Sequence, residues 1–517
     1  MAKTAIFSAV IWLSAVAAWA DGAADQQLQN WHQWRGPEAS GAAPLADPPT
    51  KWDEHTNIKW KVEVPGKGNA TPIIWGDRIF IQTAIKTDRE PEPPKNDAAD
   101  AGQIDRLPAR LVAYTDNGAA PAIPATDAKP AADAKPATDA KSADQAAAAP
   151  AAQPATPGGG PPGRGGPRGG MGMGPPKPPT NVYQFVVMCL DRKTGKTLWQ
   201  QTACEEVPHE GTHETGSFAS ASPITDGKRV FCYFGSRGLY AYDMDGKPLW
   251  QKTDFGKAKI VFSFGEGTSP ALYGDTLVIN WDQEGPSYLT ALDARTGEEK
   301  WRVNKDKEDY HTTWATPLVL ERNGAVQIVV NGKNRSRGYE LSTGKVLWEC
   351  GGQMANPIPS PVAVGDLTYC VTGFRGYAIY AIPLDSTGDI TDTDKIAWHH
   401  NEGTPYVSSP LAMGGRLFYT KDRAGILTVV DAKTGDVIID KKRLPDSLKD
   451  IYASPVGAAG RVYFLARSGD AAVIDATADD VQVLAENHLD DTFDASPAIV
   501  GKELYLRGEH SLYCIAE

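Results

Sequence analysis

Apolar, β-rich runs recur along this chain at a regular distance after a Ser-Pro or Thr-Pro dipeptide. The prolines of the eight dipeptides are Pro72, Pro223, Pro270, Pro317, Pro361, Pro410, Pro455 and Pro497. After the first interval, neighbouring prolines are 42 to 49 residues apart, and a period of about 40–50 residues is typical of propeller blades. Each unit continues with a Gly-containing turn and a strand, as at Gly227–Phe231. The pattern predicts an all-β, eight-bladed β-propeller of four-stranded antiparallel blades.

The third strand of a unit ends in Asp-x-x-Thr-Gly, and a Trp usually follows four residues after the Gly, as in Asp293, Gly297 and Trp301. The Asp can accept backbone N–H groups, and the Gly supplies the positive φ of a tight hairpin turn. We expect the Trp side chains to pack flat against the neighbouring blade. They are Trp60, Trp199, Trp250, Trp301, Trp348 and Trp398. In the sixth unit, we expect Asp440 at the position of the Trp.

Ring closure is predicted from the two ends of the repeat. The last unit, from Ser496 to Glu517, has room for three strands, and the run Asn57–Trp60 stands in the register of a fourth strand. We therefore expect the propeller to span residues 57–517, with an N-terminal strand completing the last blade. Residues 21–56 form an N-terminal segment before it. Closing the ring in this way removes an exposed sheet edge.

Residues 1–20 have the composition of a signal peptide. Lys3 precedes an apolar run from Ala5 to Trp19, and Ala18-Trp19-Ala20 is a small-x-small cleavage site. The alternative is an uncleaved anchor, but a membrane span needs roughly 20 apolar residues. No Cys follows the run, which disfavours a lipid anchor. We predict a periplasmic or secreted protein, without a membrane span.

Between 88 and 180 the composition changes to Ala, Pro, Asp, Lys and then Gly. Such a segment cannot bury enough apolar surface to offset the entropy of ordering it. We predict a disordered insertion within blade one, with a local strand at Ala109–Tyr114. The Arg-Gly run 163–170 resembles RNA-contacting segments, but a spacer is the favoured interpretation. The net charge of −12 gives no reason to expect nucleic acid.

Six cysteines in an exported chain would ordinarily suggest disulfides. Cys189 and Cys514 share one repeat position, and Cys232 and Cys370 share another. Equivalent positions of separate blades lie too far apart for a disulfide. We expect free thiols.

Candidate chemistry is sparse. His209-Glu210-Gly211-Thr212-His213 matches the H-E-x-x-H pattern of zinc proteases, which requires a helix. Gly-Thr at its centre favours a hydrogen-bonded loop. His209 and His213 are therefore only weak candidates for metal ligands.

An Arg recurs at or near the turn between the second and third strands of six units. The residues are Arg237, Arg337, Arg375, Arg423, Arg467 and Arg507. These turns and the connections between blades leave on the same face of a propeller, so we expect His311 and Trp314 there too. A face of this kind suits a ligand or partner. The alternative, favoured on general grounds, is that each Arg pairs with a loop carboxylate such as Asp309, Asp450 or Asp494.

The repeat Ala291–Trp301 resembles that of the pyrroloquinoline-quinone (PQQ) repeat family of eight-bladed propellers, and Trp31–Pro37 is similar to the opening segment of exported bacterial members. The family includes quinone-dependent alcohol and sugar dehydrogenases. It also includes non-catalytic propellers, among them the scaffold lipoprotein of outer-membrane assembly. The resemblance implies the fold but does not choose between these functions.

The dehydrogenases typically place an adjacent Cys pair over the cofactor and hold Ca²⁺ beside a catalytic Asp. No two cysteines adjoin here, and we match no calcium set. The scaffold lipoprotein has a lipidated Cys that this chain lacks. We therefore predict an exported, non-catalytic, monomeric propeller that uses one face for a protein or other macromolecular partner, with no assigned cofactor or catalytic residue. The alternative is a PQQ-dependent dehydrogenase without the Cys pair, with PQQ and calcium as cofactors.

Overall fold

The computed structural model describes residues 26–91, 112–113 and 175–517. The predicted signal peptide and most of the predicted disordered insertion lie outside the described residues and stay predictions. Among the described residues, no helix has the length and apolar character needed to cross a membrane.

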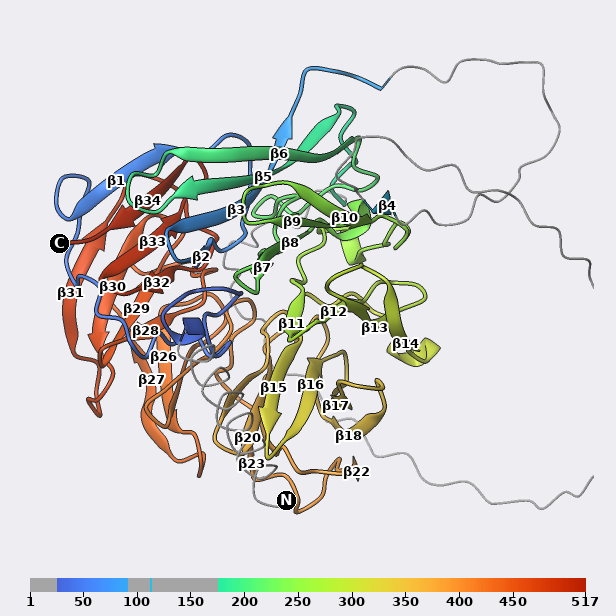
Figure 1. Cartoon of the computed structure of the whole chain (residues 1–517). Helices are drawn as coiled ribbons and strands as arrows, with labels where there is room; N and C mark the ends of the chain where they lie inside the picture. The colour runs from blue at the N-terminus through green and yellow to red at the C-terminus, as the bar shows by residue number, and fades with distance from the viewer. Residues whose placement is uncertain (1–25, 92–111, 114–174) are drawn as a thin grey trace, which may run out of the picture. The chain divides into compact units, whose positions relative to one another are not determined.

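Eight antiparallel sheets form the blades of an all-β propeller, as the repeat predicted (Figure 1). Blade one contains β2 (Ile73–Trp75), β3 (Arg78–Lys86), β5 (Tyr183–Asp191) and β6 (Thr197–Glu206). Blade two contains β7 (Ile224–Thr225), β8 (Arg229–Tyr233), β9 (Leu239–Asp243) and β10 (Pro248–Lys252). Blade three contains β11 (Ala271–Tyr273), β12 (Thr276–Trp281), β13 (Tyr288–Asp293) and β14 (Glu299–Asn304). Blade four contains β15 (Leu318–Arg322), β16 (Ala325–Asn331), β17 (Arg335–Glu340) and β18 (Val346–Gly351).

The second half of the ring repeats this order. Blade five contains β19 (Val362–Val364), β20 (Leu367–Thr372), β21 (Ala378–Pro383) and β23 (Trp398–His400). Blade six contains β24 (Leu411–Met413), β25 (Arg416–Thr420), β26 (Ile426–Asp431) and β27 (Val437–Arg443). Blade seven contains β28 (Val456–Ala458), β29 (Arg461–Leu465), β30 (Asp470–Asp475) and β31 (Val483–His488). Blade eight contains β32 (Ala498–Val500), β33 (Glu503–Arg507), β34 (Ser511–Ile515) and β1 (Ile58–Glu63).

Two blades carry a fifth strand on the outer edge. β4 (Val112–Ala113) pairs with β10, within the local strand predicted at Ala109–Tyr114. β22 (Gly388–Asp389) pairs in parallel with β18. Besides a helical stretch at residues 26–28, the described helices are three single 3₁₀ turns, η1 (Gly235–Arg237), η2 (Val261–Ser263) and η3 (Lys307–Asp309).

The closure of the ring by the N-terminal strand is confirmed. Trp60 of β1 lies opposite Cys514 of β34, and the antiparallel pairing extends to Glu63 and Ser511. Figure 1 shows this pairing as the blue strand β1 beside the red strand β34. The eighth blade is therefore built from both ends of the described propeller.

The Ser/Thr-Pro dipeptides fasten neighbouring blades to one another through their hydroxyl groups. The backbone N–H of each Ser or Thr donates to the side-chain oxygen of its counterpart in the next blade, over 2.9–3.1 Å. Seven such bonds connect eight residues in order, each residue donating to the next: Thr71, Ser222, Ser269, Thr316, Ser360, Ser409, Ser454 and Ser496. Thr71 Oγ1 donates back to the Ser496 carbonyl at 3.1 Å and completes the ring. We call these eight residues the hydroxyl ring.

The blade tryptophans pack as their spacing predicted, with one exception. The indole N–H of each donates to a turn carbonyl of the next blade, and the ring covers the Gly of that turn, as Trp250 does with Ala294 and Gly297. The others that do so are Trp60, Trp199, Trp301 and Trp398. Trp348 instead donates to Gln327 of its own blade. The turn of blade five lacks the Asp-x-x-Thr-Gly sequence, so no equivalent Gly faces Trp348.

The expectation that Asp440 replaces Trp in blade six is wrong. Ile439 stands opposite Val429, as Trp301 stands opposite Ala291. The Ile439 side chain is buried in the core, whereas Asp440 is exposed. An apolar residue keeps this position because it lies between two blades.

Residues 30–46, which we call the plug, lie along the innermost strands. Trp31 and Ile74 exchange backbone hydrogen bonds of 3.1 and 2.8 Å, while Ser40 accepts from Ala412 at 3.0 Å. The buried guanidinium of Arg35 donates to the carbonyls of Pro455 and Pro410, at 2.8 and 2.7 Å. The described part of the predicted N-terminal segment therefore lies against the innermost strands of blades one, six and seven.

All six cysteines are free thiols, as their repeat positions predicted. Five of them are buried, and burial raises the pKa of the Cys370 thiol to about 12. They act as small apolar side chains of the blades.

Candidate binding face at the channel mouth

The turns between second and third strands and the connections between blades share one face, which we call the mouth face. The predicted arginines reach it in different ways. Arg237 lies in η1, and Arg375, Arg423 and Arg467 lie in turns. Arg337 lies within β17 and Arg507 at the end of β33, so these two lie near their turns rather than in them.

Arg423 and Arg467 come from neighbouring blades and meet at one aromatic ring. Their guanidinium carbons lie 5.2 and 5.4 Å from the centroid of Tyr452, a distance typical of cation–π contacts. Both also pair with Asp450, at 3.3 and 3.9 Å. Arg467 makes a further 2.6 Å ion pair with Asp494. Blades six and seven thus share one cationic and aromatic cluster.

A second cluster lies beside the first. Phe374 and Tyr406 stack with ring centroids 4.9 Å apart, and the guanidinium of Arg375 lies 5.2 Å from the Phe374 ring. Arg375 is exposed, and no described residue forms an ion pair with it. The positive charges of Arg423 and Arg375 lie close enough to act on the Tyr406 hydroxyl group, which also hydrogen bonds with Asn356. We call Phe374, Arg375, Tyr406, Arg423, Tyr452 and Arg467 the mouth cluster.

His213 comes from the connection between blades one and two. Burial lowers the pKa of His213, and the charges of Arg423 and Arg467 lower it further. Its ring packs edge-on against Phe264, with centroids 4.9 Å apart. Residues of blades five to seven and the blade-one connection therefore share one electrostatic environment at the mouth.

Three of the predicted binding arginines are internal. Arg237 has a side chain only 4% exposed, ion pairs with Glu206 and Glu266 at 3.1 and 2.8 Å, and lies over Phe185. Arg337 is half-buried between Asp309 and Glu349, at 2.7 and 3.1 Å. Arg507 is buried, and this burial lowers its pKa to about 10. The alternative of ion pairs with carboxylates applies to Arg237 and Arg337, and also to Arg423 and Arg467, which pair with Asp450 and Asp494.

His311 and Trp314 lie on the connection between blades three and four. His311 Nδ1 is 3.0 Å from Glu284, and its Nε2 is 2.8 Å from Asn356. The Trp314 indole donates to the Gly265 carbonyl at 2.8 Å. His311 links the blade-three connection to Asn356, which contacts the mouth cluster.

The H-E-x-x-H match forms a loop without helix. His209 Nε2 lies 2.7 Å from the Ala258 carbonyl, and His213 Nδ1 lies 2.8 Å from Thr215 Oγ1. Glu210 accepts a hydrogen bond from the backbone N–H of Ile260 at 3.0 Å. Within residues 26–91 and 175–517, no group of three or more His, Cys, Asp or Glu side chains is arranged to hold a metal.

Sequence reasoning missed Tyr406, Tyr452 and Phe374. A usable signal was present, since Trp314, Tyr452 and Asp494 each stand two residues before the Ser or Thr of a dipeptide. Side chains two residues before the Ser or Thr lie next to the hydroxyl ring in the sequence of each connection.

The PQQ and calcium of the dehydrogenase alternative can be tested against these residues. Arginines and aromatic rings at the mouth would suit a flat, carboxylate-bearing molecule. A calcium ion needs six to eight oxygen ligands, and the described residues form no carboxylate group of that kind. We therefore assign no calcium ligands among the described residues.

The comparisons with known proteins agree with the repeat and the fold. The family model described as outer membrane protein assembly factor BamB matches residues 184–382 and 285–516. The chain belongs to this PQQ-repeat family. No curated protein matches.

Solved structures share the architecture. A europium-containing methanol dehydrogenase is 11% identical, with a TM-score of 0.58 over 96% of this chain and 100% of the other. The quinohemoprotein alcohol dehydrogenase from Comamonas testosteroni is 10% identical, with a TM-score of 0.53 over 95% and 81%. BamB from Moraxella catarrhalis is 14% identical, with a TM-score of 0.46 over 64% and 91%. At these identities the likeness to the two dehydrogenase structures, whose TM-scores exceed 0.5, establishes the fold alone.

Proposed function

We propose that this protein is an exported, non-catalytic propeller whose mouth face binds a protein or other macromolecular partner. The observation that carries this proposal is the mouth cluster. Arg375 and Arg423 present exposed guanidinium groups beside the aromatic rings of Phe374 and Tyr452. Arg and Tyr are the residue types that most often supply binding energy at interfaces.

The cluster also indicates the chemistry of the partner. Arg375 has no carboxylate partner among the described residues, and Arg423 shares Asp450 with Arg467. A partner segment with carboxylates and an apolar side chain would pair with the guanidinium groups and cover the rings. BamB, whose family model matches, is described as an assembly factor, which is consistent with a macromolecular partner.

The test is quantitative affinity capture from periplasmic extract with wild-type protein and the Arg375→Ala/Arg423→Ala double variant. A charge-matched control replaces Arg295 and Lys193, which are exposed residues of turns on the opposite face. We expect the double variant alone to lose the captured protein, because truncating an interface Arg can cost about 2 kcal/mol or more. Equal capture by all three would remove the proposal.

The dehydrogenase alternative has a separate test. Titrating purified protein with PQQ and Ca²⁺, followed by absorbance and dye-linked alcohol oxidation, should give no turnover if the protein is a binding propeller. Alcohol-dependent dye reduction that requires both additions would favour the dehydrogenase.

A further inference from the structure

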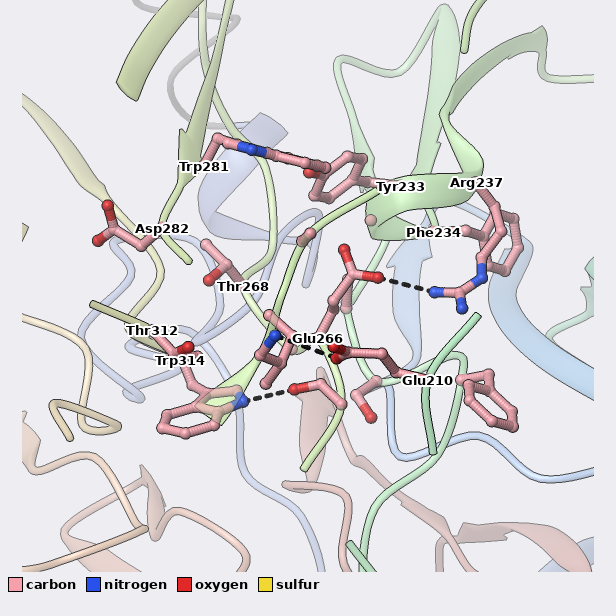
Figure 2. A pocket seen from close by; sticks show the side chains of 18 of the residues that line it. Glu210, Tyr233, Phe234, Arg237, Glu266, Thr268, Trp281, Asp282, Thr312 and Trp314 are labelled. Carbon is pink, nitrogen blue, oxygen red and sulfur yellow. Dashed lines mark hydrogen bonds and ion pairs between the residues drawn. The ribbon is translucent and has the colours of Figure 1, made fainter. Parts of the chain in front are cut away.

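A hollow lies between blades two and three on the mouth face. The space that a water-sized sphere can reach in it is about 40 Å³, and the figure is about 660 Å³ when the adjoining open solvent is counted. Glu210, Tyr233, Glu266, Trp281, Asp282 and Trp314 are among its lining residues (Figure 2). It shares no residue with the mouth cluster. The hollow is therefore a second, independent candidate site.

Its aromatic wall is rigidly built. The Trp281 ring is stacked between Phe255 and Tyr288, with centroids 5.7 and 5.9 Å away and planes 17° and 18° apart. Trp314 is fixed by its hydrogen bond to Gly265. Tyr233 is only 4% exposed, and no described residue hydrogen bonds to its hydroxyl. Figure 2 shows Tyr233 beside Trp281 at the same end of the hollow.

The charges around the hollow do not balance. Asp282 is neutralised by Lys305, and Glu266 pairs with Arg237. Arg237 is already shared with Glu206. Glu210 receives one backbone hydrogen bond at Oε2, and no described residue contacts its Oε1. The lining therefore carries excess negative charge.

The hydrogen-bonding groups also favour a donor ligand. His209 Nε2 lies 2.7 Å from the Ala258 carbonyl oxygen, and in a neutral ring bonded in this way Nδ1 is an acceptor. That Nδ1 is buried without a partner among the described residues. The hydroxyls of Thr268 and Thr313 already donate to the Thr313 carbonyl and to Asp282. Unused acceptors remain at Glu210 and His209.

We propose that this hollow binds an organic ammonium group, as found in an alkyl amine or a lysine side chain. Carboxylates attract such a cation, and the half-buried ring of Trp314 can add a cation–π contact, whereas both faces of Trp281 are covered by Phe255 and Tyr288. An anion would meet the carboxylates at close range without compensation. Glu210 is the residue assigned to pair with the bound nitrogen.

The test is an NMR titration that follows the ¹⁵N indole resonances of Trp281 and Trp314, assigned with the Trp281→Phe and Trp314→Phe variants. The probes are n-butylammonium, N-acetyl-lysine amide, n-butanol and butyrate, at constant ionic strength. We expect the two ammonium probes to shift both resonances in a saturable way. Butanol or butyrate binding as tightly as n-butylammonium would overturn the proposal.

Glu210→Gln is the decisive variant, because its amide oxygen can still accept from Ile260 while the charge is lost. We expect n-butylammonium to bind on the order of tenfold more weakly. The matched control, Glu38→Gln, changes an exposed carboxylate on the plug and should bind as wild type does. Equal affinity in Glu210→Gln and wild type would contradict the assignment. Tighter binding of N-acetyl-lysine amide than of n-butylammonium would identify a peptide side chain as the source, and the reverse order a free amine.

Discussion

The indole N–H of Trp60 donates to the backbone carbonyl of Arg192 at 3.0 Å. Trp60 belongs to the last blade of the ring and Arg192 to the first. The ring also covers Gly195, whose φ of +70° allows the turn to approach it closely. This side chain is one of the contacts that join the first and last blades, together with the Thr71–Ser496 hydrogen bond.

Trp60→Ala should therefore behave as a core mutation. Truncating a buried aromatic residue typically costs about 3–5 kcal/mol. The measurement is the free energy of unfolding in denaturant, with the exposed Leu45→Ala as control. A loss no larger than that of the control would contradict the role of Trp60 in closure.

The hydroxyl ring can be tested at Ser409, which accepts the backbone N–H of Ser360 and lies at a buried position. Ser409→Ala leaves that N–H without its acceptor, which costs about 1–3 kcal/mol. Ser409→Thr keeps the oxygen, and Thr occupies this repeat position at Thr71 and Thr316. We expect Ala to lower the thermal midpoint clearly more than Thr. The reverse order would show that the hydroxyl is dispensable.

The free energy of unfolding should depend on pH through His32, a residue of the plug. Burial lowers the pKa of His32 from 6.5 to about 4. Between these values the unfolded chain takes up a proton that the folded protein does not, so stability is full above pH 6.5 and falls towards pH 4. The loss is about 3 kcal/mol.

His32→Gln has no imidazole and should flatten the pH dependence over this window. Unfolding free energies measured at several pH values for both proteins would test this. Identical slopes would assign the pH dependence to other groups.

Arg237 and Arg375 should respond differently to replacement by Ala. Removing Arg237 leaves Glu266 without its buried partner, and breaking such a pair costs about 3–5 kcal/mol. Arg375→Ala removes an exposed side chain and should change stability by less than about 0.5 kcal/mol. Parallel thermal denaturation distinguishes the two. Similar losses would show that Arg375 is structural.

Replacing residues 92–178 by a short Gly-Ser linker should leave the fold intact. The pairing of β3 with β5 extends to Lys86 and Tyr183, and Thr87 and Val182 continue it with a 3.0 Å backbone hydrogen bond. Loop length changes closure entropy only slowly. A single cooperative transition near that of wild type is expected, and a broad or absent transition would show that the segment packs.

The repeat determined most of the fold in advance. The Ser/Thr-Pro period predicted eight blades because each blade must present the same surfaces to its neighbours. The hydroxyl ring was not predicted, although its residues belong to the Ser/Thr-Pro dipeptides that define the repeat. The hydrogen bonds between blades join residues about 45 positions apart in the chain, so the pattern within one unit does not show them. Trp348 departed from expectation because the turn sequence of blade five changed. Ile439 keeps the spacing of four residues after Gly435, so the expectation at Asp440 was displaced by one residue.

The candidate site was less accessible to sequence reasoning. Aligning the arginines placed Arg423 and Arg467 on the mouth face, but it could not show that they share Tyr452. Nor could it separate the exposed Arg375 from Arg237, because burial depends on Glu206 and Glu266 of neighbouring segments. The hollow between blades two and three combines loops whose residues have no common repeat pattern.

The pairing of β1 with β34 has a consequence for biogenesis. Ile58 and Ile515 are among the paired residues, so the ring cannot close until almost the whole described chain has emerged from the ribosome. Until then β1 has no partner strand and the eighth blade lacks its outer strand, and unpaired strand edges promote aggregation. An exported chain would complete this step only after translocation, so its folding would depend on conditions outside the compartment where it is made.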